Sequence, residues 1–262
     1  MRLPLGGSRA WLRAQSVAGA ATGAARRLLE QSPPGGHERW QRTNYAGRRV
    51  SLQGGPAAAV GLVAGAAAQG RVRTAVGLAA IGVVGAYDDL YGDSGTKGVR
   101  GHLGALRSGV VTSGTIKTVV VSAAGMVIAR GEARSRGLGL LRDGALVAGA
   151  ANVVNLFDLH PGRAFKVAAP AALLPGGGPI AGVAGALIAD DLRGRMMLGD
   201  CGSNAVGAAV GAALVRDLPP TARWLALGAA AAITYASEHV SFSELIEQHP
   251  VLDRIDRAGR SW

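Results

Sequence analysis

The chain has 262 residues, enough for one large domain, and 48% of them are hydrophobic while only 4% are aromatic. Its net charge of +11 is compatible with nucleic-acid binding, but no helix-turn-helix, zinc or RNA-binding signature accompanies it, so we expect no nucleic-acid partner. The single cysteine, Cys201, excludes a disulfide framework within the chain.

The N-terminal part, residues 1–36, contains a weakly apolar segment at Trp11–Leu29 that carries three arginines. It lacks the compact apolar core and cleavage site of a signal peptide, so we interpret it as an amphipathic surface helix or a weak first membrane span. Residues 37–262 hold the stronger apolar segments and form the main, membrane-embedded domain in this interpretation.

Apolar segments rich in small residues follow one another through the main domain. Small side chains let helices approach closely in a membrane, so we predict an all-α fold, a polytopic membrane bundle of about eight to nine short transmembrane helices. Several segments are too short for a hydrocarbon core of about 30 Å unless flanking Gly, Ser and Thr residues extend them. The segments are Pro56–Ala68, Thr74–Ala86, Gly109–Ala129, Ala145–Phe157, Val167–Leu174, Pro179–Ala189, Ala205–Val215 and Leu225–Ala236.

Loop charges give these segments an orientation. If the loop at 37–55 is cytoplasmic, alternation places four further loops on the same side, and Lys and Arg are more numerous there than in the outside loops. The further cytoplasmic loops are 87–108, 158–166, 190–204 and 237–262. We therefore predict a multi-pass protein of the cell membrane with a cytoplasmic C-terminal tail.

A soluble helical protein rich in Ala and Gly is the alternative, with the apolar segments as core helices. The modest hydropathy favours it, whereas the near absence of charge inside the segments opposes it. The exception is Lys117, which lies inside a predicted span. Its ammonium either snorkels to the membrane surface or points into a site.

Four polar motifs each follow an apolar segment, and the predicted orientation places all of them on the cytoplasmic side. A carboxylate is costly inside a bilayer and ordinary in a solvated loop. Acidic residues at the ends of apolar helices therefore predict one site at the membrane surface that holds a divalent metal and suits a phosphorylated lipid. The motifs are Asp88-Asp89, the basic loop with Lys97, Arg100 and His102, the set Asn152, Asn155 and Asp158, and Gly199-Asp200-Cys201-Gly202-Ser203.

Each motif alone has a simpler interpretation. Asp88-Asp89 is then a solvated helix end, and Asn152 and Asn155, one helical turn apart, form hydrogen bonds between helices. Adjacent helix residues point about 100° apart, so Asp88 and Asp89 are expected to have different roles.

Taken in order, the motifs resemble those of the polyprenyl-phosphate N-acetylhexosamine-1-phosphate transferases. This membrane family includes the phospho-MurNAc-pentapeptide translocase and the GlcNAc-1-phosphate transferases of teichoic acid and O-antigen assembly. The resemblance runs from about Thr43 to the C-terminus and includes the family's aspartate pair, its Asn-x-x-Asn-x-x-Asp pattern and its Gly-Asp-x-Gly-Ser motif.

The resemblance implies transfer of a sugar-1-phosphate from a UDP-sugar to a polyprenyl phosphate, with release of UMP and a requirement for Mg²⁺. It implies Asp200 as the main magnesium ligand with Asp89 or Asp88 nearby, and Asp88, Asp89 and Asp158 as catalytic carboxylates. We expect the active site to face the cytoplasm, and a homodimer is a candidate assembly. Expected substrate contacts come from Lys97, Arg100, His102, Asn152, Asn155, His160, Arg163 and Ser203.

The chain departs from the family pattern in one loop. The family reads Asp-Gly-Leu-Asp-Gly where this chain reads Asp158-Leu159-His160-Pro161-Gly162, so Pro161 replaces the second aspartate. That loop contacts the nucleotide base in the family, which puts uridine recognition in doubt. A catalytically reduced paralogue that binds polyprenyl phosphate or a partner enzyme without turnover is therefore the alternative function. Asp190 and Asp191 also replace an uncharged Asn of many relatives.

Overall fold

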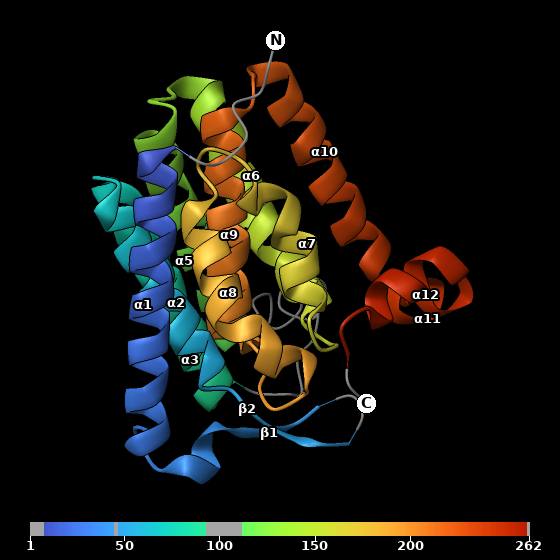
Figure 1. Ribbon diagram of the computed structural model, residues 1–262. Coiled ribbons are helices and arrows are strands. Elements are labelled where there is room, and N and C mark those ends of the chain that lie inside the picture. The colour runs from blue at the N-terminus through green and yellow to red at the C-terminus, as the bar shows by residue number, and fades with distance from the viewer. Residues whose placement is uncertain (1–7, 45–46, 93–111, 261–262) are drawn as a thin grey trace.

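The structure is a computed structural model that describes residues 8–44, 47–92 and 112–260. Within these residues the fold is all-α apart from one two-stranded hairpin, and a helix covers or largely covers each predicted apolar segment (Figure 1). The helices are α1 (Arg9–Gln31), α2 (Gly54–Ala68), α3 (Val72–Tyr91), α5 (Ser113–Glu132), α6 (Gly137–Phe157), α7 (Arg163–Ala172), α8 (Gly178–Leu192), α9 (Gly199–Asp217), α10 (Pro220–Ser237), α11 (Phe242–Gln248) and α12 (Pro250–Arg257).

Helix α9 is the central element of the bundle, and α2, α3 and α6 pack directly on it. Its neighbours approach so closely that side chains are excluded at several contacts. A Cβ atom at Gly85 of α3 would lie 2.5 Å from the Asp200 carbonyl oxygen, and one at Gly207 would lie 2.4 Å from the Ala150 carbonyl oxygen. The small residues of the sequence are therefore required where backbones meet around α9.

The N-terminal helix α1 packs along α2 and α8 rather than standing apart (Figure 1). Ala14 and Ala18 on α1 are fully buried, and a Cβ at Gly182 of α8 would lie 2.2 Å from the Gln15 carbonyl oxygen. Residues 9–31 thus form part of the same helical bundle.

The predicted loop at 37–55 contains regular structure. A 3-10 turn (His37–Trp40) leads into strand β1 (Gln41–Thr43), which pairs antiparallel with β2 (Arg49–Ser51). Met197 donates a backbone hydrogen bond to the Ser51 carbonyl at 3.0 Å, so the hairpin lies against the segment that leads into α9. Three-residue strands are too short to produce a recognisable alternation in the sequence.

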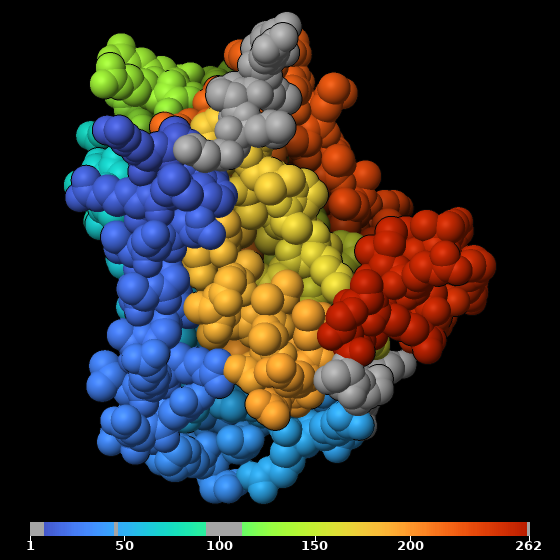
Figure 2. Space-filling view, in the orientation of Figure 1, coloured from blue at the N-terminus to red at the C-terminus, as the bar shows by residue number. Residues whose placement is uncertain are grey.

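The C-terminal part leaves the compact bundle. Helix α10 diverges from the bundle axis, and α11 and α12 project from its lower end in Figures 1 and 2. By length and composition, α6 is the one described helix able to cross a membrane, and α2 is a shorter apolar helix. The polytopic membrane arrangement accordingly stays a proposal.

Candidate functional site

Three charged side chains from three helices meet at the end of the bundle where α3 ends and α9 begins. The Lys117 ammonium on α5 donates to Asp88 Oδ2 at 2.6 Å and to Asp200 Oδ2 at 3.0 Å. The Asp88 side chain is 11% exposed, that of Lys117 21% and that of Asp200 25%, so the cluster is shielded but reachable from solvent. Of the two interpretations of Lys117, the structure supports the one in which it points into a site.

Asp88 and Asp200 lie beyond the ends of the predicted apolar spans. The pKa values of their carboxyl groups shift in opposite directions. Burial disfavours the charged form of Asp88, but hydrogen bonds led by that from Lys117 hold its pKa below the ordinary value. Burial raises the pKa of Asp200, and the charge of Lys117 offsets this only in part. The cluster therefore holds two acidic groups around one ammonium, so these surroundings favour a bound cation.

Asp89 has a different partner from its neighbour, as the geometry of adjacent helix residues predicts. Its Oδ1 accepts the backbone N–H of Asp200 at 2.8 Å, and its Oδ2 accepts that of Cys201 at 2.9 Å. Helix α9 has no side-chain cap from its own N-cap residue, Leu198, so Asp89 caps it from α3. Burial, followed by the charge of Asp200, raises the pKa of Asp89 to about 7.

This placement bears on the metal role expected for Asp89. Both of its oxygens already hold backbone N–H groups, whereas Asp88 shares a cation with Asp200. We therefore expect Asp88, rather than Asp89, to be the second metal ligand beside Asp200.

The two asparagines of the third motif face different helices. Asn155 Oδ1 lies 2.6 Å from Ser203 Oγ, which is also 2.5 Å from the Gly199 carbonyl oxygen. Asn152 Nδ2 instead donates to Thr234 Oγ1 on α10 at 2.9 Å. Both asparagines of α6 therefore make the interhelical hydrogen bonds of their simpler interpretation, Asn155 to α9 and Asn152 to α10.

Asp158 and Asp191 line one small cavity of about 10 Å³ together with His160 and Pro161. Asp158 Oδ2 and Asp191 Oδ2 are both buried and have no hydrogen-bond partner among the described residues. Burial, followed by the charge of Asp191, raises the pKa of Asp158 well above its ordinary value, and burial raises the pKa of Asp191 to about 7. A cavity of this size holds about one water molecule and is far smaller than a pyrimidine ring.

Arg163 was expected to contact substrate, and the structure places it elsewhere. Its guanidinium forms a bidentate pair with Asp256 of α12, with both distances at 2.8 Å, and donates to Ser243 Oγ at 3.0 Å. The Arg163 and Asp256 side chains are only 5% and 7% exposed. Arg163 therefore holds the C-terminal tail on the bundle. No sequence pattern indicates this pairing, because Arg163 and Asp256 are far apart along the chain.

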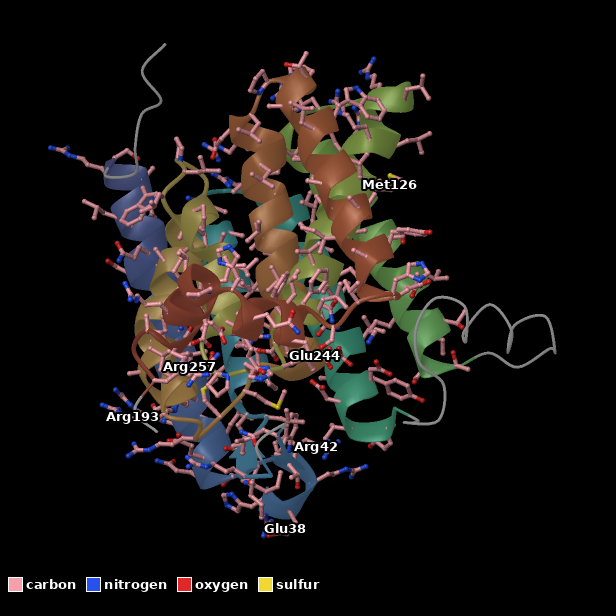
Figure 3. All side chains as sticks on the ribbon, turned by 90° about the vertical axis from the view of Figure 1, so that its right-hand side faces the viewer. Glu38, Arg42, Met126, Arg193, Glu244 and Arg257 are labelled. Atoms are coloured by element: carbon pink, nitrogen blue, oxygen red, sulfur yellow. The ribbon has the colours of Figure 1, made fainter. Side chains whose placement is uncertain are left out.

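Three residues that were predicted to contact substrate fall outside the described part of the chain, and one contact near the site comes from a residue that was not predicted. Lys97, Arg100 and His102 lie outside the described part of the chain. Arg42 of β1 donates to the Asp89 carbonyl oxygen, a contact that the basic composition of its loop does not single out. Figure 3 shows Arg42, Glu38 and Arg193 toward the same end of the molecule, with Met126 toward the other.

The residues present fit a magnesium ion in their chemistry. Among the described residues no group of three or more His, Cys, Asp or Glu side chains could hold a metal. Mg²⁺, however, is typically bound by one or two carboxylates together with substrate phosphates and water. Asp88 and Asp200 supply two carboxylates that already meet on one cation, the Lys117 ammonium.

Comparison with known proteins adds no relative: no protein-family model, curated protein or solved structure matches the chain.

Proposed function

We propose that this chain is a membrane-embedded, Mg²⁺-dependent enzyme that transfers a sugar-1-phosphate from a UDP-sugar to a polyprenyl phosphate and releases UMP. The observation that carries the proposal is the convergence of Asp88, Lys117 and Asp200 from three helices. Sequence segments that resemble separate motifs of one transferase family thus supply neighbouring side chains. Two carboxylates at one point repel each other unless a cation lies between them.

The surface of α10 supports the membrane part of the proposal. Between Arg223 and Glu238 the helix carries no charged residue, yet Ala230 is its one buried residue. Trp224 and Leu225 are 56% and 76% exposed. A helix that is apolar on every side belongs in a protein core or in lipid, and this one is not in the core.

Helix α3 supports the same conclusion. Val76 and Val83 share its outward face and are 57% and 72% exposed, and no charged residue occurs between Arg73 and Asp88. A soluble helical protein would carry polar side chains on such a face. The alternative of a soluble protein with apolar core helices is therefore disfavoured.

Each site residue has a chemical task in this proposal. Asp200 and Asp88 would hold Mg²⁺, which would supply positive charge to the pyrophosphate and the leaving UMP. Asp89 positions Asp200 by capping α9, and Asn155 orients Ser203 in the first turn of the same helix. Lys97 and Arg100 are proposed to balance the charge of the lipid phosphate.

The alternative function, binding of polyprenyl phosphate or a partner enzyme without turnover, is favoured by one observation. The loop expected to contact the nucleotide base encloses a cavity of about 10 Å³, which cannot admit a base. Arg260 Nε donates to the Pro161 carbonyl at 3.1 Å and so fastens this loop to the tail. Turnover requires either movement of this loop or a base site elsewhere.

The experiment that separates the two functions measures UMP release. Purified protein in lipid nanodiscs is incubated with undecaprenyl phosphate, MgCl₂ and single UDP-sugars. We expect UMP from at least one UDP-sugar, dependent on both the lipid phosphate and Mg²⁺. The Asp253→Asn variant is the matched control, because Asp253 pairs on the surface with Arg257 within α12 and should leave turnover unchanged.

Binding of undecaprenyl phosphate without UMP release from any UDP-sugar would support the non-catalytic function. Absence of both binding and release would contradict the transferase function and the lipid-binding form of the alternative.

A further inference from the structure

Lys117 occupies the position that the proposed function gives to a metal ion. Its ammonium lies 2.6 Å from Asp88 Oδ2 and 3.0 Å from Asp200 Oδ2. We propose that Lys117 is an internal counter-ion that competes with the divalent cation: its ammonium neutralises Asp88 and Asp200 until the cation binds, and is then displaced. This inference rests on the proposed function, because it concerns the same site.

The two cations cannot share the position. Mg²⁺ lies 2.0–2.1 Å from its oxygen ligands, so an ion bound to both carboxylates would lie close to the present ammonium. At such a separation two positive charges repel strongly, even with the screening typical of a protein surface. The ammonium therefore has to leave when the ion enters.

The surroundings allow this displacement. Lysine has a flexible four-carbon stem, and the Lys117 side chain is 21% exposed rather than sealed in the core. The preceding turn of α5 carries Ser113, which also hydrogen-bonds Asp88, so Asp88 keeps a donor when the ammonium departs. The released ammonium is then available to a phosphate anion.

Lys117 also has a consequence for the cation-free protein. Without a positive charge between them, Asp88 and Asp200 would repel each other across the junction of α3 and α9. The ammonium keeps this junction neutral and joins both helices to α5. A purely structural bridge would do the same, but it would stay in place when the cation binds.

Cation binding to variants distinguishes a competitor from a permanent bridge. We would measure Mn²⁺ affinity by electron paramagnetic resonance for the unmodified chain, Lys117→Met and Lys166→Met. Removing a competing positive charge should tighten Mn²⁺ binding by about tenfold or more in Lys117→Met. Lys166 is the matched control because its Nζ donates to the Asp256 carbonyl, away from Asp88 and Asp200. Its variant should keep the original affinity.

A second measurement uses the unmodified chain and does not depend on the folding of a variant. Lys97, Lys117 and Lys166 are the chain's lysines, so mass spectrometry can follow the acylation of each one separately. An ammonium that donates to two carboxylates reacts slowly, and its release should speed acylation. We expect saturating Mg²⁺ to increase the acylation rate of Lys117 severalfold and to leave that of Lys166 unchanged.

The outcomes separate this inference from the proposed function. Equal Mn²⁺ affinity in the unmodified chain and Lys117→Met, with unchanged Lys117 acylation, would overturn the inference and leave the metal site intact. The metal site would be overturned as well if Mn²⁺ binding persisted in Asp200→Asn. It would also be overturned if neither the unmodified chain nor Lys117→Met bound Mn²⁺.

Discussion

Asp89 on α3 accepts the backbone N–H of Asp200 on α9 at 2.8 Å, so one aspartate of the candidate site sets the position of another. The second oxygen of Asp89 accepts the N–H of Cys201 at 2.9 Å. Gly85, one turn before Asp89, brings the two backbones close enough for this cap. A small shift of α9 along α3 would therefore move the Asp200 carboxylate away from Asp88.

The first prediction is that Asp89→Asn lowers stability. Asn presents one acceptor and one donor, so one N–H of the first turn of α9 loses its partner. A lost cap costs about 1–2 kcal/mol. We expect a lower melting temperature when unfolding in lipid nanodiscs is monitored by tryptophan fluorescence. The control variant Asp253→Asn should keep the original melting temperature. An unaltered melting temperature would show that Asp89 does not hold α9.

The second prediction is that Asp200→Asn abolishes Mg²⁺-dependent turnover while the fold survives. Asn keeps the volume of the side chain and loses its charge, so the loss should lie in metal affinity. Raising the Mg²⁺ concentration in the UMP assay should recover part of the activity. Normal turnover at low Mg²⁺ would exclude Asp200 as the metal ligand.

The third prediction concerns docking of the tail through Arg163 and Asp256. Arg163→Met should weaken this docking by about 2–3 kcal/mol, since Arg260 still contacts Asp256 at 2.7 Å. Hydrogen exchange of residues 242–257 should accelerate. The control is Arg257→Met, which removes an exposed arginine paired within α12. Equal exchange in both variants would contradict the anchoring role.

The same pair predicts the pH dependence of tail docking. Burial disfavours the charged form of Asp256, but the hydrogen bond from Arg163 holds its pKa below the ordinary value of about 3.9. The contribution of this ion pair is therefore complete above about pH 4 and is lost as the pH falls through the lowered pKa. Between pH 5 and 8 tail exchange, corrected for its intrinsic rate, should not change through this group.

The fourth prediction concerns Pro161, which stands where the transferase family that the motifs resemble has its second loop aspartate. If the site uses a nucleotide-sugar, Pro161→Asp should tighten UDP-sugar binding by roughly one to two powers of ten, the value of a charged hydrogen bond of about 1.5–3 kcal/mol. Pro161→Ala is the control for loop stiffness. No UDP-sugar binding in any form would favour the non-catalytic function.

The fifth prediction is that the tail lies in the cytoplasm. The native Cys201 is 2% exposed, so it should give little background in thiol labelling. In intact cells an impermeant thiol reagent should label Arg136→Cys, in a predicted outside loop, but not Glu247→Cys in α11. Glu247→Cys should react once the membrane is opened. Labelling of Glu247→Cys in intact cells would reverse the orientation.

The sequence by itself determined the helical content and the approximate place of each predicted helix, because the apolar segments are rich in small residues and nearly free of charge and breaker signals separate them. It also indicated that Asp88 and Asp89 differ, since that follows from the 100° step between helix residues. Asp200 and Ser203 could be singled out because their motif is contiguous.

Only the tertiary structure decided which polar residues meet. Lys117 lies inside an apolar segment and reaches Asp88 and Asp200 through the packing of α5 against α3 and α9. Arg163 pairs with Asp256 because α12 lies against the start of α7. Such contacts join residues distant in the chain, and local pattern carries no information about which helix ends come together.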